Sequence, residues 1–206
     1  MRNPALLLPF LLAACESVPV PPPQGGATGV VAIQVRTQER TSAETVYPTA
    51  VWFVRLEEGD DPDVAGPVLK SSYHHSGHVY LLNAAPGRYC AVACAVLIDG
   101  KLHHTFFPPE CVRATRGDLP EGGWSYLGLC RLRIRPGLGE DDRTEQHYAA
   151  QILPQGKQDV VDRLFPRNLS FTATRWEVDR AAERDEAARK RARKILGKAG
   201  WSDRLP

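Results

Sequence analysis

The chain has 206 residues, of which 26 are basic and 24 acidic, so its formal net charge at pH 7 is only +2. This near balance excludes the strongly basic composition through which proteins attract nucleic acid in bulk. After an N-terminal segment of about 28 residues, the remaining length suffices for one hydrophobic core and falls short of two typical domains. We therefore expect one globular domain without a nucleic-acid partner.

The N-terminus has the three parts of a secretory signal peptide. Arg2 supplies a positive start, residues 5–14 are almost entirely apolar, and small residues end the run at Ala13 and Ala14. This run is shorter than the roughly 20 residues that a membrane-spanning helix needs. Residues 1–14 are therefore predicted to be a signal peptide.

The end of this segment, Leu12-Ala13-Ala14-Cys15, resembles the lipobox of bacterial lipoproteins. The resemblance implies cleavage before Cys15, a diacylglyceryl group on its sulfur and usually a third acyl chain such as palmitate on its amine. Two acyl chains suffice for stable anchoring. An ordinary secretory signal with an incidental cysteine is the alternative. Glu16 replaces the aspartate that the family associates with inner-membrane retention, so we expect an outer-membrane protein facing the periplasm.

Residues 15–28 combine the lipidated cysteine with a proline- and glycine-rich linker. Pro19 and Pro21-Pro22-Pro23 favour an extended chain, whereas Gly25-Gly26 adds flexibility. The segment has little apolar surface. It is predicted to be a stalk that holds the domain away from the bilayer.

Residues 29–138 have the pattern of an antiparallel β-sandwich. In residues 29–36 the apolar Val31, Ile33 and Val35 alternate with polar residues, which predicts a half-buried strand. Residues 50–56 are apolar on both faces, which favours an internal strand. The strand at residues 124–135 is predicted to place Tyr126, Cys130, Leu132 and Ile134 on one face and Arg131, Arg133 and Arg135 on the other.

Two turns are predicted to form hairpins within this region. Ala84-Ala85-Pro86-Gly87 separates the strands at residues 78–83 and 88–98, and a Pro-Gly pair favours a tight turn. Asp99-Gly100 is a strong two-residue hairpin signal before residues 101–107.

Residues 139–206 are predicted to form a helical C-terminal part of the same domain. One helix is expected near residues 143–153, a short turn at 159–164, and a long last helix capped by Thr174 or Asp179. A stripe of small residues would pack this last helix on or beside the sheet. Its C-terminal half is basic, which is typical of a solvated helix face and would alternatively suit anionic lipid head groups. The fold class is thus mainly β with C-terminal helices, α+β. The stripe of small residues on the last helix consists of Ala181, Ala188, Ala192, Ile195 and Ala199.

The order of "PGRY", "FFPPEC", "WSYLG" and a charged helix ending in "GKAGW" is similar to that of small bacterial envelope lipoproteins with a β-sandwich body. The segment L-x-x-x-PGRY also resembles prealbumin-like and carboxypeptidase-regulatory-like modules. These resemblances imply a fold and a location, and they carry no catalytic residues.

Four cysteines besides Cys15 could form disulfides: Cys90, Cys94, Cys111 and Cys130. Cys90 and Cys94 would lie about 13 Å apart in one strand, too far for a bridge. The remaining pairings are 90–111 with 94–130 and 90–130 with 94–111. Export to an oxidising compartment favours bridges, whereas the apolar strand favours buried free thiols.

Five histidines lie in two neighbouring segments that a three-strand meander would bring together: His74, His75, His78, His103 and His104. His78 and His104 are weak metal-ligand candidates. The usual nucleophile-elbow, zincin and phosphate-loop motifs are absent from the sequence, so we expect no enzyme and no cofactor. The sequence favours a lipid-anchored envelope module that binds or scaffolds an envelope protein; the alternative is a periplasmic metal-binding lipoprotein that uses these histidines.

Overall fold

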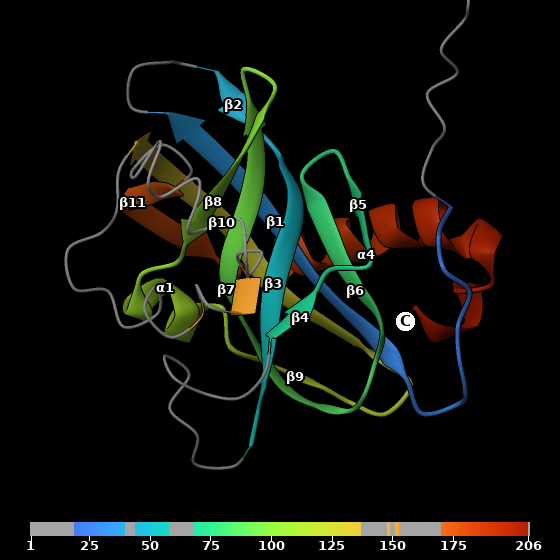
Figure 1. The fold of residues 1–206 in the computed structure, drawn as a ribbon. Coiled ribbons are helices and arrows are strands. Elements are labelled where there is room, and N and C mark those ends of the chain that lie inside the picture. The colour runs from blue at the N-terminus through green and yellow to red at the C-terminus, as the bar shows by residue number, and fades with distance from the viewer. Residues whose placement is uncertain are drawn as a thin grey trace, which may run out of the picture.

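Strands dominate the chain, as the alternating patterns predicted (Figure 1). The computed structural model describes residues 19–39, 44–57, 68–136, 148, 151–152 and 170–205. The strands are β1 (Gly29–Glu39), β2 (Thr45–Val46), β3 (Pro48–Leu56), β4 (Val68–Lys70), β5 (Tyr73–His75), β6 (His78–Ala84), β7 (Gly87–Ile98), β8 (Lys101–Phe106), β9 (Gly117–Leu119), β10 (Trp124–Pro136) and β11 (Ser170–Asp179). Helices α1 (Pro109–Ala114) and α4 (Ala182–Leu196) and two short 3-10 turns (Gly197–Ala199 and Ser202–Arg204) complete the described elements.

The strands form two facing layers around a hydrophobic core, which confirms the predicted α+β sandwich. They are hydrogen-bonded in the order β4-β3-β7-β8-β11-β10-β1-β6-β5, with β2 added to β1 and β9 to β7. The core joins apolar residues of β1 and β10 in one layer to those of β3 and β7 in the other. Most pairs are antiparallel, but β1 pairs with β10 and β8 with β11 in parallel, which the sequence analysis did not anticipate.

The layers are joined on both sides. On one side, the pairing of β8 with β11 continues the sheet around the turn. On the other side, the Ser71 amide donates to the Val51 carbonyl of β3 at 2.8 Å, and the Ser72 amide donates to the Tyr80 carbonyl of β6 at 2.9 Å. The segment from β4 to β5 therefore leaves one layer and enters the other, and β3 is an internal strand as predicted.

Of the two predicted hairpins, one is confirmed and one is wrong. Asp99 and Gly100 both have positive φ, 50° and 72°, and connect the antiparallel strands β7 and β8. In contrast, β6 pairs with β1 and β5, whereas β7 pairs with β3, β8 and β9. The turn at residues 84–87 therefore crosses between the layers. Pro86 and Gly87 favour a turn, but they do not determine which strands pair with those on either side of it.

A bulge in β10 corrects the predicted position of Tyr126. Gly128 has a φ of 110°, and the register of β1 against β10 shifts between Ala32 and Gln34. An extra residue in a strand reverses the alternation of its side chains. Cys130 and the apolar residues that follow it face the core as predicted, whereas Tyr126 lies on the outer face with α4.

The outer face of β1, β6 and β10 carries a second apolar cluster, which α4 covers (Figure 1). Ala188, Ala192 and Leu196 of the helix are buried there against Ala32 and other sheet residues. This cover buries both faces of β1 at its start, where the sequence predicted one exposed face. The predicted packing of the last helix on the sheet is confirmed, although Ala181 is exposed.

The region predicted to be helical contains a strand. β11 spans Ser170–Asp179 and lies between β8 and β10, so Thr174 belongs to a strand and caps no helix. The Asp179 carboxylate instead accepts a hydrogen bond from the Ala181 amide at 3.1 Å, just before α4. Of the helix predicted near residues 143–153, Tyr148, Gln151 and Ile152 are described and are helical. The turn predicted at 159–164 lies outside the described residues.

The linker is packed on the domain from Val20 onward, so its prediction as a free stalk is wrong for this part. Val20 packs against the second apolar cluster, and the Trp201 indole donates to the Pro21 carbonyl at 2.8 Å. Asn83 donates from Nδ2 to the Pro22 carbonyl at 3.0 Å. The carbonyl of a proline can still accept a hydrogen bond. The linker therefore packs through its backbone although it has few apolar side chains. The signal peptide and Cys15 lie outside the described residues.

Among the residues that the structure describes, none of the helices has the length and apolar character needed to cross a membrane.

Candidate functional site

Arginines gather on the outer face of β1, β10 and β11, beyond the start of α4. The strand register places Arg36 of β1 beside Arg131 of β10, and Arg133 of β10 opposite Arg175 of β11. Like charges directly opposite each other destabilise a sheet. We call Arg36, Arg131, Arg133 and Arg175 the arginine surface. The repulsion among these arginines is not offset by any contact between them. The concentration of positive charge makes this surface suited to binding an anion.

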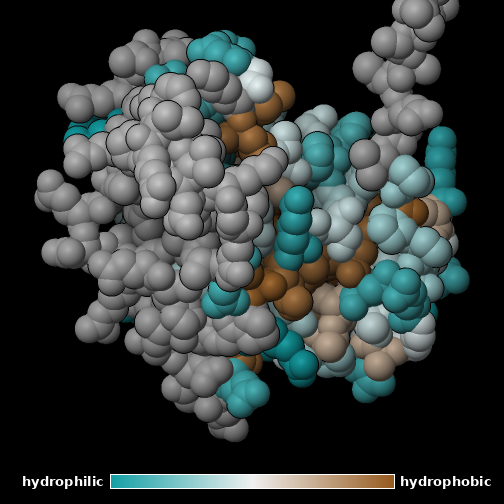
Figure 2. Space-filling model, viewed as in Figure 1, coloured by the Kyte–Doolittle hydropathy of each residue, from teal (hydrophilic) through white to brown (hydrophobic). Residues whose placement is uncertain are grey.

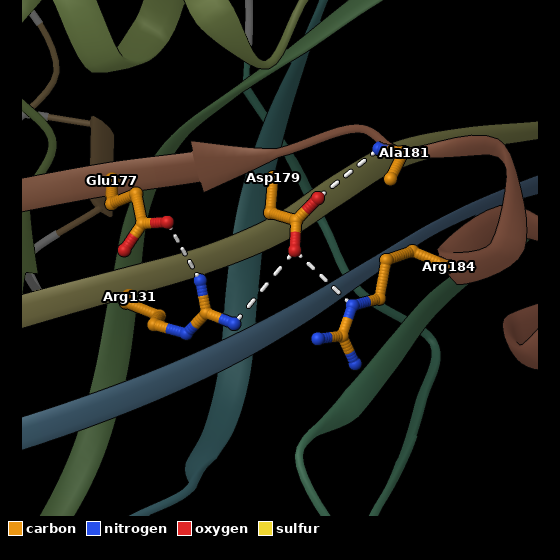
Figure 3. Close-up of polar contacts among 5 residues, drawn as sticks. All are labelled: Arg131, Glu177, Asp179, Ala181 and Arg184. Carbon is orange, nitrogen blue, oxygen red and sulfur yellow. Dashed lines mark hydrogen bonds and ion pairs between the residues drawn. The ribbon is translucent and has the colours of Figure 1, made fainter.

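One member of the arginine surface is fixed by carboxylates (Figure 3). Arg131 contacts Glu177 at 2.9 Å and Asp179 at 3.8 Å, and Asp179 also contacts Arg184 of α4 at 3.1 Å. The Ala181 amide and then the two guanidinium groups lower the pKa of Asp179. Exposed ion pairs of this kind contribute little to stability. Their effect is to orient Arg131 and to join the end of β11 to α4.

The other three arginines of the surface have no carboxylate partner within the described part of the chain. They line a groove of about 400 Å³ together with Gln38, Thr45 and Trp176. Trp176 pairs with Leu132 and follows Arg175 in the strand, so its indole, 38% exposed, lies on the other face of the sheet from the arginines. Guanidinium groups bind carboxylates and phosphates through paired hydrogen bonds.

Polar groups continue inward from the arginine surface, under α4. Arg36 Nε, Arg191 Nε, the hydroxyls of Tyr80 and Tyr126 and His78 Nδ1 are buried and have no hydrogen-bond partner among the described residues. Burial, followed by the charge of Arg191, lowers the pKa of His78 to about 4. Burial raises the pKa of both tyrosines. At neutral pH this polar cluster therefore holds two cations, a neutral histidine and two neutral phenols.

A second groove, of about 510 Å³, lies at the turn between the layers, beside Leu56, Gly87 and Pro120. Its charged residues include Arg88 and Asp118, which pair with each other at 2.9 Å. Their mutual pairing makes this groove a weaker candidate than the arginine surface.

The two histidine segments are not brought together. His75 and His78 are opposite each other on β5 and β6, whereas His103 and His104 lie on β8, which pairs with neither strand. His104 packs against Trp52 with 5.3 Å between ring centroids. The meander prediction is wrong because β7 and β8 continue in the opposite layer. In the described ranges, which include His74 and the other four histidines of these segments, no group of three or more His, Cys, Asp or Glu could hold a metal ion.

All four cysteines of the domain are buried. Cys111 Sγ of α1 lies 3.5 Å from Cys130 Sγ of β10. This contact and burial raise the pKa of Cys130, and burial together with Cys111 raises that of Cys94. The nearest pair, 111–130, was in neither pairing that the sequence left open. Sequence reasoning missed it because α1 was not anticipated.

Sequence reasoning found Arg131 and Arg133 on the outer face of their strand but could not find Arg175, because β11 was not predicted. Comparison of the chain with models of protein families, with curated proteins and with solved structures finds no match. Its class is therefore stated from the fold: an α+β sandwich with an arginine-lined outer face.

Proposed function

We propose that this protein is a lipid-anchored module of the bacterial cell envelope that binds an acidic segment of another envelope protein through the arginine surface. The proposed anchoring is based on Leu12-Ala13-Ala14-Cys15, in which Cys15 is the lipidated residue. The outer membrane is the proposed location of the protein. The observation that supports binding is the groove where Arg36, Arg133 and Arg175 have no carboxylate partner in the described ranges.

A protein partner is favoured by the composition of this groove. Arginine is enriched in protein–protein interfaces, where it is among the residues that often supply most of the binding energy. An acidic peptide would supply the carboxylates that the three arginines lack.

Binding is favoured over catalysis by the chemistry of the same side chains. Arginine stays protonated at every physiological pH, so it cannot act as a general base. Glu177, the one carboxylate among the described residues that line the groove, is paired with Arg131. The groove is therefore suited to recognition of charge.

The test measures binding of a fluorescent oligoglutamate peptide to the acylated protein in nonionic micelles. Arg133→Gln with Arg175→Gln should weaken binding at least tenfold, and binding of the wild type should fall as salt increases. Arg88→Gln, which removes an arginine from the second groove, is the matched control and should leave binding unchanged. Wild-type binding at background level, or equal binding by the double variant, would contradict the proposal.

A further inference from the structure

The packed linker fixes where the membrane anchor lies relative to the domain. Pro21 accepts a hydrogen bond from Trp201, Asn83 donates to Pro22 and accepts from the Gln24 amide at 2.6 Å, and Arg204 donates to the Thr28 carbonyl at 3.2 Å. These partners come from the end of β6 and from the C-terminal residues. The linker therefore belongs to the body from Val20 onward, and it runs alongside the end of α4 (Figure 1).

Only a short piece of chain separates this packed linker from Cys15. Five peptide units connect Cys15 to Val20, and a fully extended chain spans about 3.3–3.6 Å per residue. The acylated cysteine therefore lies within about 18 Å of Val20, whatever the conformation between them. The Trp201 indole donates to the Pro21 carbonyl, and Pro23 lies beside Gly200, so the residues that directly follow α4 are packed against the linker.

The end of α4 that is nearest to the anchor is basic. Lys190, Arg193, Lys194 and Lys198 are exposed there. The nearest acidic residues are Glu186, one turn before Lys190, and Asp203, in the last 3-10 turn. In Figure 2 teal, hydrophilic groups lie at the right edge of the molecule, the side on which Figure 1 draws α4, among paler and brown ones. The apolar side of the helix is already buried against the sheet, so this basic side is the one left for another partner.

We propose that the C-terminal half of α4 lies against the anionic head groups of the membrane in which Cys15 is anchored. This inference rests on the proposed lipid anchor and assigns a second binding surface, distinct from the arginine surface. Basic residues close to a bilayer are attracted by anionic lipids over about one Debye length, roughly 8–10 Å. The short connection to Cys15 allows the helix to come close enough to the bilayer for this attraction to act. The arginine surface, on the same side of the sheet but beyond the start of α4, is left for a protein partner.

The test uses the full acylated protein reconstituted into vesicles of phosphatidylcholine alone or with phosphatidylglycerol. Lysines are acetylated with a water-soluble reagent, and the rate at each site is measured by mass spectrometry. We expect Lys190, Lys194 and Lys198 to react at least threefold more slowly in the anionic vesicles, with the difference lost at high salt. Lys70 of β4 is exposed, lies in the other layer and is the internal reference.

Equal rates in the two kinds of vesicle, relative to Lys70, would overturn the inference. A variant in which Lys190, Lys194 and Lys198 are replaced by Gln should remain anchored, and its limited-proteolysis pattern should become insensitive to lipid charge. Intact mass and flotation of the same samples report acylation and anchoring. A missing acyl group would therefore show that the proposed anchor failed, independently of the lysine rates.

Discussion

The sulfur of Cys111 lies 3.5 Å from the sulfur of Cys130, so the short helix α1 and the longest strand, β10, meet at two buried thiols. A disulfide needs about 2.05 Å between sulfurs, which a small movement of the side chains would provide. In an oxidising compartment such a pair is expected to be bridged during folding, before the core excludes oxidants.

The first prediction follows from this contact. Protein exported to the periplasm should carry a Cys111–Cys130 link and no Cys90–Cys94 link, as measured by peptide mapping without reduction. Cys130→Ala should then destabilise the domain by about 2–5 kcal/mol. Four free thiols in the exported protein would contradict this prediction and support the interpretation of the cysteines as buried apolar residues.

The anchor is tested by Cys15→Ser. Without its sulfur the chain cannot receive a diacylglyceryl group, so the variant should accumulate as an uncleaved precursor or a soluble product. Detergent partitioning and intact mass measure the outcome. If the variant partitions as the wild type does, and the wild type carries no acyl mass, the lipoprotein hypothesis is wrong.

The cover that α4 provides should be essential to stability. Leu196 is fully buried in the second apolar cluster, so Leu196→Ala should reduce the free energy of unfolding by about 2–5 kcal/mol. Lys194→Ala, at an exposed position of the same helix, should change it by less than about 0.5 kcal/mol. Denaturant unfolding of both variants checks the pair; equal values would show that the helix contributes little.

The bulge in β10 depends on Gly128. A side chain there would meet the backbone of Asp179 and the side chain of Val178 at 3.0 Å, in a backbone conformation that other residues rarely adopt. Gly128→Ala should therefore destabilise the domain by more than about 1 kcal/mol. Gly26→Ala is the control, because nothing lies within 4 Å of the added atom. A melting temperature unchanged by both substitutions would argue against the bulge.

His78 should make stability depend on pH. The pKa of His78 is lowered from its ordinary value of 6.5 to about 4 in the folded protein, because burial and Arg191 disfavour the charged ring. The unfolded chain therefore binds the proton first as pH falls. The contribution of neutral His78 is complete above about pH 6.5 and is lost as pH falls toward 4, by at most about 3 kcal/mol. His78→Gln should flatten this part of the stability–pH curve, whereas an unchanged slope would exclude His78 as its source.

Local signals predicted local structure well. Asp99 and Gly100 determine the hairpin of β7 and β8 because two residues with positive φ leave only one way to pair the flanking strands. The turn at residues 84–87 carries an equally clear signal, yet its strands separate into different layers. That choice depends on β1 and β3, whose pairings with β6 and β7 are long-range contacts that no short pattern encodes.

The least predictable part of the candidate site was β11. From Arg175 to Asp179 charged residues alternate with Trp176 and Val178, but this run is short and directly precedes the charged residues of α4, so it does not stand out as a strand. Its neighbours, β8 and β10, supply the pairing that its own sequence does not specify. The contribution of Arg175 and Glu177 to the groove could therefore be identified only from the fold.

The position of β11 also determines the order in which the molecule can be completed. This strand joins β8 to β10, but it is made after residue 169 of a chain of 206. Until it emerges, β8 and β10 have unpaired edges, which are prone to association with other chains. Contacts so distant in sequence also slow folding. If the chain is exported as proposed, β11 would emerge late, and the edges of β8 and β10 would stay exposed during that interval.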